Sequence, residues 1–329
     1  MKIALLTAKK RFDTFCNPAD IPEGAELVFL GTNYTEEEAI AKLSDTEALL
    51  VDSVLPVTEK MIAAMPKLKF IQAEGVAYNK IDIEAAAKAG VFVSNNRAVN
   101  AAQVAEHSVM LILAVLHRLI EGDAEVRAGR QNDAKLRFIE EGLEDIIGKK
   151  VGLVGFGAIG KELAKRLLPF GTELFYYDPF RASPEVEAEY SISYMEKEEL
   201  LSSCDIITLH VPVTPSTTNF INADTLALMK PNAIIINAAR GLVVDTQALA
   251  DAIMAGKIYG AGLDTIEPEP VPIDSPVLTM PEPWSRHVVL SPHVAGTTKN
   301  VFFTAYRNFW KNVKAVANGE KPMNIVNGL

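Results

Sequence analysis

Cysteines, positive charges and long apolar runs are all scarce in this sequence. Its 329 residues include only two cysteines, Cys16 and Cys204, too few for a disulfide framework or a metal knuckle. The formal net charge of −10 makes nucleic acid and anionic membranes poor partners. No apolar run reaches the roughly 18 residues of a membrane span, and the apolar N-terminal segment is too short for a signal peptide. We therefore expect a reduced, soluble, cytoplasmic protein.

Several catalytic signatures are also missing. The sequence has no H-E-x-x-H or C-x-x-C spacing, so no metal site is predicted, and no G-x-S-x-G nucleophile elbow. Its composition is that of an ordinary globular protein, with 49% apolar and 22% charged residues. The length favours about two domains.

Short apolar strands alternate with helical segments along most of the chain, which predicts an α/β fold built on parallel sheets. The expected strands are 2–7, 25–30, 49–52, 70–71, 91–94, 151–154, 172–177, 205–211, 233–237, 259–263 and 288–290. The expected helices are 35–43, 58–65, 83–89, 101–119, 161–168, 223–229, 245–255 and 297–316. Thr35 and Glu38 form a predicted capping box. The polar segment 118–147 is either an arm that wraps a partner subunit or a solvated helix pair.

The most informative stretch begins at Val151 and ends at Asp178. A short apolar strand leads into Gly155, Gly157 and Gly160, which have the spacing G-x-G-x-x-G, and a helix and a second strand follow. In a βαβ unit these glycines permit a tight turn, close approach to a pyrophosphate and close helix packing. The phosphates would lie at the positive end of the helix dipole.

Asp178 lies about 20 residues beyond the glycines, where a carboxylate accepts hydrogen bonds from a ribose diol. Its charge would repel a 2′-phosphate, so we predict NAD rather than NADP. The alternative is a structural turn that binds no ligand.

Polar side chains follow each of the late strands, where an open α/β sheet binds its ligands. Arg240, Asp264, Glu269 and His293 all belong to such positions, and so does His210. An imidazolium can protonate the oxygen of a ketone that accepts hydride, and a nearby carboxylate fixes its tautomer. A guanidinium can hold a substrate carboxylate in a bidentate pair. We assign His293 as acid/base, Glu269 as its partner and Arg240 as the substrate clamp.

We interpret His107 and His117 as packing residues of an apolar helix.

The segments VGLVGFGAIG, LHVPVTPST, INAARGLVVDTQAL, GAGLDTIEPEP and LSPHVAGTT, together with VAEHSVMLIL, resemble the D-isomer-specific 2-hydroxyacid dehydrogenases. The resemblance implies the catalytic set Arg240, Glu269 and His293 and two doubly wound, Rossmann-like domains around a cleft. We expect residues 1–98 plus 300–329 to bind substrate and 99–299 to bind NAD. Homodimers through the cofactor domains are also implied. The expected cofactor contacts are Gly155, Gly157, Ala158, Ile159, Gly160, Asp178, Val211, Pro212, Ala238, Ala239, Arg240, Asp264, His293 and Gly296.

In such enzymes a glycine-containing loop of the first domain recognises the substrate carboxylate. The matching residues are Gly75, Val76 and Ala77, with Tyr78 beside them. Enzymes for phosphorylated substrates often carry an arginine before the glycine, whereas here the preceding residues are Ala73 and Glu74. An anionic Glu74 argues against a phosphorylated substrate, while Arg97 is either a compensating cation or a solvent-facing loop residue.

We therefore predict an NAD-dependent oxidoreductase that interconverts a D-2-hydroxy acid and its 2-oxo acid. A D-3-phosphoglycerate dehydrogenase of serine biosynthesis is the first alternative, although the sequence ends soon after its last predicted helix and we expect no appended regulatory domain. A non-catalytic, NAD-sensing binding protein of the same fold is the second.

Overall fold

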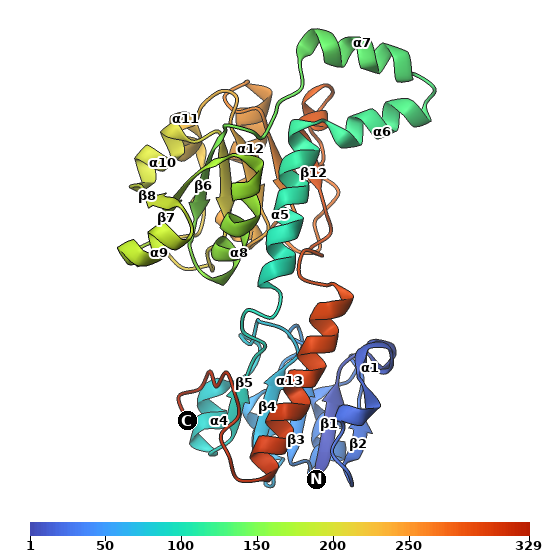
Figure 1. Cartoon of the computed structure of the whole chain (residues 1–329). Coiled ribbons are helices and arrows are strands. Elements are labelled where there is room, and N and C mark those ends of the chain that lie inside the picture. Colours follow the sequence, from blue (N-terminus) through green and yellow to red (C-terminus); the bar gives the residue numbers. More distant parts are fainter. The chain divides into compact units, whose positions relative to one another are not determined.

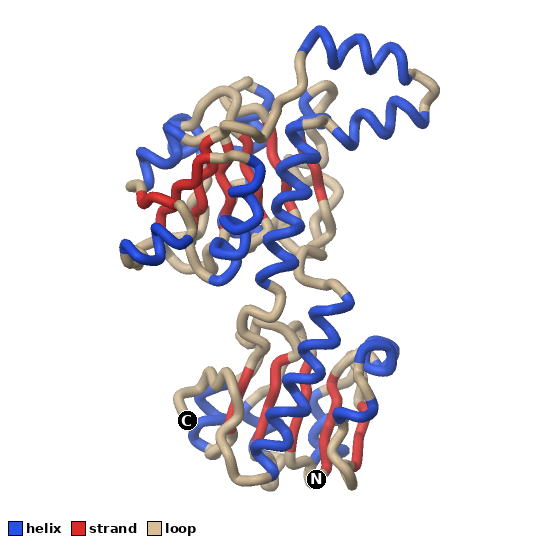
Figure 2. Tube along the Cα trace, in the orientation of Figure 1, coloured by secondary structure: helices blue, strands red, loops and turns tan.

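The computed structural model describes residues 1–329 and divides the chain into two compact units. Unit 1 comprises Met1–Asn100 and Thr297–Leu329, and unit 2 comprises Ala101–Gly296. Each unit has a parallel β-sheet with helices packed against it (Figure 2). This confirms the predicted fold class of two parallel-sheet α/β domains. None of the helices combines the length and apolar character needed to cross a bilayer.

Unit 1 has a five-stranded parallel sheet in the order β2-β1-β3-β4-β5 (Figure 1). Its strands are β1 (Lys2–Leu6), β2 (Glu26–Phe29), β3 (Ala48–Val51), β4 (Phe70–Ala73) and β5 (Phe92–Ser94). Its helices are α1 (Lys9–Phe15), α2 (Glu36–Leu43), α3 (Glu59–Ala63), α4 (Ile83–Lys88) and α13 (Lys299–Ala317), with a 3₁₀ turn at Pro18–Asp20.

Two hydrophobic layers cover the sheet of unit 1. Helices α1 and α13 pack on one face, where Tyr306, Phe309, Trp310 and Val313 lie at the helical spacing that places them on one side of α13. Helices α2, α3 and α4 pack on the other face. The capping box of α2 is present, because Thr35 and Glu38 each bond the backbone N–H of the other.

Unit 2 has a seven-stranded parallel sheet in the order β12-β11-β10-β9-β6-β7-β8. Its strands are β6 (Lys150–Val154), β7 (Glu173–Tyr177), β8 (Ile192–Tyr194), β9 (Ile206–Leu209), β10 (Ile234–Asn237), β11 (Gly260–Leu263) and β12 (Val288–Leu290). Its covering helices are α5 (Ala101–Leu116), α8 (Ala158–Leu167), α9 (Pro184–Glu189), α10 (Lys197–Ser203), α11 (Ala223–Leu228) and α12 (Thr246–Met254), and 3₁₀ turns lie at Leu168–Phe170, Gly241–Val243 and Trp284–His287.

The core of unit 2 also has two layers. Helices α5 and α8 bury their apolar sides on one face of the sheet, and α10, α11 and α12 do so on the other. The strands β9 and β10 are buried along their whole length, as expected for parallel strands covered on both faces.

A pair of helices extends from the sheet of unit 2. Helices α6 (Leu119–Arg127) and α7 (Gln131–Glu141) follow α5 and form an arm that carries few of the unit's core residues (Figure 1). The predicted segment 118–147 therefore contains a helix pair, and its residues after Glu141 are not helical.

Candidate active site

The glycine turn lies between β6 and α8 and has the shape that a dinucleotide requires. Gly155 has a φ of 96°, and a Cβ atom there would lie 2.7 Å from the carbonyl oxygen of His210. A Cβ atom at Gly160 would lie 2.6 Å from the carbonyl oxygen of Gly155, so the helix passes very close to the turn. Gly157, in contrast, has no atom within 4 Å of the added Cβ. This open space in front of a helix N-terminus fits a pyrophosphate.

The turn also lies where the strand order reverses. In unit 2, β6 has β7 on one side and β9 on the other, so the chain winds in opposite directions from this point. Ligands of doubly wound sheets bind beyond the carboxyl ends of the strands at such a switch point. Val211 and Pro212 follow β9 on this edge, while Ala158 and Ile159 form the first turn of α8.

Asp178 follows β7 and uses its carboxylate to brace the glycine turn. One oxygen accepts the N–H of Phe156 at 2.9 Å, and the other accepts the N–H of Phe180 at 2.9 Å. Each carboxylate oxygen keeps a second lone pair, so Asp178 can still accept hydrogen bonds from a ribose.

The predicted chemical residues follow three neighbouring strands. Arg240 comes after β10, Glu269 lies in the loop after β11, and His293 comes after β12. The Nδ1 atom of His293 lies 2.8 Å from a carboxylate oxygen of Glu269, and both side chains are nearly half exposed. Because the carboxylate accepts from Nδ1, the Nε2 atom of His293 is left for a substrate.

The Arg240 loop packs against the loop that leads to Glu269. A Cβ atom at Gly241 would lie only 2.4 Å from the backbone nitrogen of Glu267, so only glycine fits at this crossing. The side chain of Asn237 donates to the carbonyl oxygen of Arg240 at 2.9 Å and accepts the N–H of Ala239 at 3.0 Å. These bonds fix the segment Ala238–Arg240 and leave the guanidinium exposed at the carboxyl edge of the sheet.

Asp264 is buried behind this edge. Its carboxylate accepts the N–H groups of Val294 and Ala295, so it supports the loop that carries His293 and leads to Gly296. Burial opposes its ionisation, but hydrogen bonds from His107, Ser291 and these backbone groups outweigh burial and lower the pKa of Asp264 well below its usual value.

His210 is unsuited to proton transfer at neutral pH. Burial lowers the pKa of His210 to about 4, because the charged imidazolium loses its hydration. Its Nε2 atom lies 2.8 Å from the hydroxyl of Thr208. His210 is therefore neutral, and its backbone packs against Gly155.

The predicted carboxylate loop of unit 1 is held by its neighbours in that unit. The N–H of Gly75 donates to Ser53 Oγ at 3.0 Å, and its carbonyl oxygen accepts the N–H of Asn96 at 2.9 Å. The next two N–H groups, those of Val76 and Ala77, donate to no group of the protein. Successive free N–H groups of this kind are suited to an anion.

The structure does not support the use of Glu74 as an argument against a phosphorylated substrate. The side chain of Glu74 is only 6% exposed and forms an ion pair with Arg11, which also bonds Asp52. Thr7 and Tyr306 donate further hydrogen bonds to it. Burial, which outweighs these partners, raises the pKa of Glu74. Its charge is compensated inside unit 1 and cannot serve as an argument against a phosphorylated substrate.

The surroundings of Arg97, Tyr78 and His117 also bear on the sequence analysis. Arg97 is exposed and has no acidic partner, whereas Tyr78 packs partly against the core of unit 1. His117 is exposed rather than packed. No sequence pattern indicated the role of Arg11, because its partner Glu74 lies 63 residues further along the chain.

The sequence from 109 to 295 matches the model of the D-isomer specific 2-hydroxyacid dehydrogenase NAD-binding domain. The chain belongs to this family. It is 40% identical over 293 residues to a glyoxylate reductase of Thermococcus litoralis, an alignment that covers 88% of this chain and 86% of the relative. The predicted reaction class, NAD-dependent interconversion of a D-2-hydroxy acid and its 2-oxo acid, is confirmed.

Two further comparisons place the chain within this dehydrogenase family. A D-3-phosphoglycerate dehydrogenase of Methanocaldococcus jannaschii is 36% identical over 91% of this chain, but the chain spans only 55% of that relative. The crystal structure of a D-lactate dehydrogenase with NAD⁺ from Lactobacillus jensenii is similar with a TM-score of 0.83 and 28% identity, over 99% of both chains. The fold of the dehydrogenase is thus shared along its whole length, while the substrate differs among relatives.

Proposed function

We propose that this dehydrogenase reduces a short, unphosphorylated 2-oxo acid of the glyoxylate or hydroxypyruvate type. The chemistry depends on one observation above all, the pairing of His293 with Glu269 on the same sheet edge as the glycine turn. The substrate size is supported by the similarity to glyoxylate reductases over nearly their full length. The absence of an arginine at Ala73 and Glu74 supports it too, since an arginine often precedes the glycine in enzymes for phosphorylated substrates.

The proposed roles follow from the free atoms of each side chain. NADH bound at the glycine turn of Gly155, Gly157 and Gly160 would supply the hydride. The Arg240 guanidinium binds the substrate carboxylate and polarises the carbonyl group. His293 donates a proton from Nε2 to the carbonyl oxygen as negative charge develops there. Glu269 accepts a hydrogen bond from Nδ1 of His293, which directs Nε2 away from Glu269. In the oxidation direction, Nε2 takes up the hydroxyl proton. Within unit 1, the free N–H groups of Val76 and Ala77 are suited to a carboxylate.

A phosphorylated 2-oxo acid is the second candidate. The ion pair with Arg11 compensates the negative charge of Glu74, so this charge would not repel a phosphate group. The exposed, unpaired Arg97 offers a positive charge that could attract one. The two candidates differ in the charge that the substrate carries beyond its carboxylate.

A substrate panel separates these candidates. Glyoxylate, hydroxypyruvate, pyruvate and phosphohydroxypyruvate would be tested with NADH by the loss of absorbance at the nicotinamide band. We expect the highest kcat/KM for glyoxylate or hydroxypyruvate. A preference for phosphohydroxypyruvate would support the second candidate, and failure to reduce any of the four would contradict the proposal and favour the NAD-sensing alternative.

Replacing the acidic residue after β7 should change cofactor preference. We expect Asp178→Ala to relax the discrimination against NADPH, because the carboxylate that would repel a 2′-phosphate is removed. The ratio of kcat/KM for NADH to that for NADPH is the measurement, and Asp145→Ala, in the segment that precedes β6, is the control. An unchanged ratio in Asp178→Ala would mean that Asp178 does not read the ribose.

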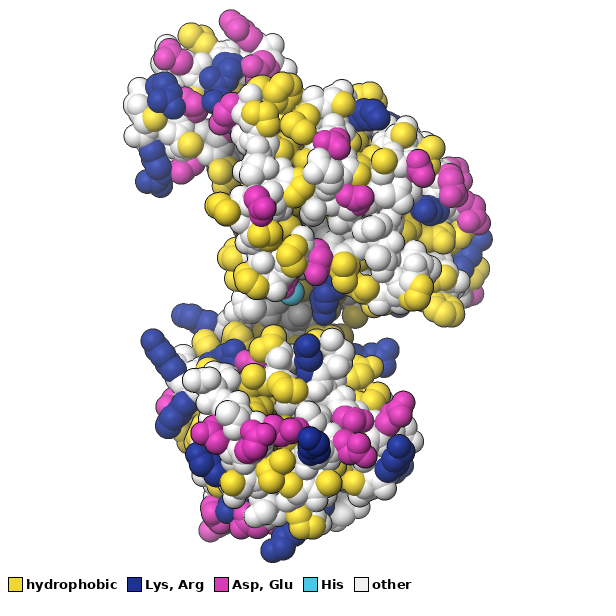
Figure 3. All heavy atoms as spheres, turned by 180° about the vertical axis from the view of Figure 1, so that it is seen from behind, with side chains coloured by type: hydrophobic (Ala, Val, Ile, Leu, Met, Phe, Trp, Pro, Cys, Tyr) yellow, Lys and Arg dark blue, Asp and Glu magenta, His cyan; other side chains and the backbone are white.

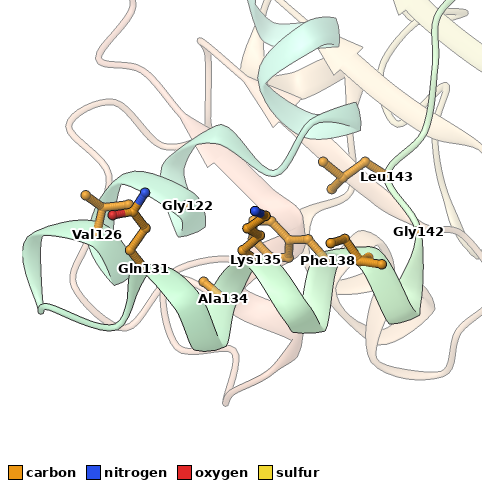
Figure 4. A pocket seen from close by; sticks show the side chains of 9 residues that line it. Gly122, Val126, Gln131, Ala134, Lys135, Phe138, Gly142 and Leu143 are labelled. Carbon is orange, nitrogen blue, oxygen red and sulfur yellow. The ribbon is translucent and has the colours of Figure 1, made fainter.

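We further propose that the arm of α6 and α7 forms a homodimer interface. The two helices enclose an apolar groove of about 670 Å³, lined by Val126, Phe138 and Leu143 among others (Figure 4). Ile139, which also lines the groove, is 68% exposed. On the visible face of the arm, hydrophobic side chains lie among acidic and basic ones (Figure 3). A core of exposed apolar groups with charges around it is typical of an interface.

A buried ion-pair cluster holds the arm in place for such contacts. Glu121 of α6 accepts hydrogen bonds from Arg118, Arg137 of α7 and Arg286, at 2.7, 2.6 and 2.9 Å. Burial opposes the charge of Glu121, but the three arginines outweigh it and lower its pKa. The arm is therefore tied to the rest of unit 2 before any partner binds.

The substitution Ile139→Glu should convert a dimer to a monomer, because it places a charge in the apolar centre of the interface. Sedimentation velocity gives the mass directly. Ile273→Glu is a matched control, since Ile273 is 88% exposed on a loop of unit 2 outside the arm. A wild-type monomer, or a dimer that survives Ile139→Glu, would contradict the proposal.

We also propose a cytoplasmic location, supported by the two cysteines, both of which are free and buried. Recovery of the activity outside the cytoplasmic fraction of its cells would contradict this location.

A further inference from the structure

The backbone that presents His293 has an unusual conformation. His293 has a φ of 55°, in the left-handed region that residues other than glycine seldom adopt. Asp264 accepts hydrogen bonds from three consecutive N–H groups of this turn. Its carbonyl oxygen accepts the N–H of His293 at 2.8 Å, and its carboxylate accepts those of Val294 and Ala295 at 2.9 Å each. The direction of the His293 side chain thus depends on the placement of the Asp264 carboxylate.

Two further side chains hold that carboxylate from behind. Ser291 donates its hydroxyl proton to Asp264 Oδ1 at 2.6 Å. The Nε2 atom of His107 lies 2.8 Å from Ser291 Oγ and 3.4 Å from the same Asp264 oxygen. Because the only hydroxyl proton of Ser291 goes to the carboxylate, the hydrogen bond between His107 and Ser291 must be donated by Nε2 of His107. The order of donation is therefore His107 to Ser291 to Asp264.

The helix that carries His107 is itself fixed on the sheet. His107 lies in α5, which packs against β10 and β11. A Cβ atom at Gly262 of β11 would lie 3.0 Å from Cβ of Leu111, one turn beyond His107. The Asp264 side chain is fully buried and that of His107 is 14% exposed, so water does not replace these bonds readily.

We propose that His107 and Ser291 are positioning residues for the reduction. They hold the Asp264 carboxylate, which in turn holds the left-handed turn that directs His293 toward the substrate. This inference rests on the proposed role of His293 as the proton donor. It replaces the interpretation of His107 as a packing residue.

The test compares His107→Leu with His107→Gln, whose amide N–H can still donate to Ser291. We expect His107→Leu to lower kcat by up to roughly 100-fold through misplacement of His293, with little change in the KM for the 2-oxo acid. His107→Gln should restore most of the loss. His117→Leu is the matched control, because His117 directly follows the same helix and is exposed, and it should leave kcat unchanged.

The double mutant His107→Leu/His293→Ala distinguishes a positioning role of His107 from a general effect on the structure. If His107 acts through His293, adding His107→Leu to His293→Ala should cause no further loss of kcat. An equal further loss, or a normal kcat in His107→Leu, would overturn the inference. Should His107→Leu not fold, Ser291→Ala removes the same connection with a smaller change, and the same outcomes apply. If His293→Ala itself left kcat unchanged, the proposed function would fail instead.

Discussion

The substitution His293→Ala should lower kcat by about 100- to 10,000-fold, the usual contribution of a positioned general acid. The expected loss is large because no other group can supply the proton at this edge of the sheet. His210 stays neutral near pH 7, since burial lowers its pKa to about 4, and His107 is engaged with Ser291. Stopped-flow measurement of 2-oxo acid reduction with NADH gives the rate constant directly.

Two controls show whether this loss is chemical. The dissociation constant of NADH, measured by fluorescence, should change little in His293→Ala, because the glycine turn lies elsewhere on the sheet edge. Glu269→Gln should cause a smaller loss, since an amide can still hold His293 but does not stabilise its charged form. Retention of most activity by His293→Ala would exclude His293 as the acid.

The substitution Arg240→Ala should raise the KM for the 2-oxo acid and lower kcat/KM by roughly 100-fold, which corresponds to about 3 kcal/mol for charge-assisted hydrogen bonds to a carboxylate. The guanidinium is exposed and makes only one side-chain hydrogen bond within the protein, from Nη1 to the carbonyl oxygen of Ala239. Its other donors are therefore available to a substrate. Initial rates over a range of 2-oxo acid concentrations at saturating NADH give both constants.

Arg240→Lys is the informative companion variant. Lysine keeps the charge but cannot form a planar, bidentate pair, so kcat/KM should fall between those of the wild type and Arg240→Ala. A full recovery by lysine would mean that charge alone matters. A KM unchanged in Arg240→Ala would show that the clamp is another residue.

Much of the fold could be predicted because its main elements have strong local patterns. The buried strands β3, β9 and β10 are short apolar runs, and the capping box at Thr35 marks the start of α2. Elements with few apolar residues gave no such signal. Helix α1 buries only Phe12, and the edge strand β8 has only three residues. Neither element is therefore marked in the sequence by a hydrophobic periodicity.

The site shows the same contrast between local and distant information. The glycine turn and the pair of His293 with Glu269 follow strands of a parallel sheet, and their common edge follows from topology. The surroundings of Glu74 and His107 depend on partners far away in the sequence. Arg11 is 63 residues from Glu74, and Ser291 is 184 residues from His107. No local sequence pattern predicts such contacts. The negative charge of Glu74 was visible in the sequence, but its partner was not.

The most direct test of the account is a crystal structure of the enzyme with NADH and oxamate, an unreactive analogue of a 2-oxo acid. The account predicts that His293 Nε2 lies within hydrogen-bonding distance of the analogue's carbonyl oxygen and that Arg240 contacts its carboxylate. It also predicts that the pyrophosphate lies against Gly157. Oxamate bound out of reach of both His293 and Arg240, beside a correctly placed nicotinamide ring, would contradict it.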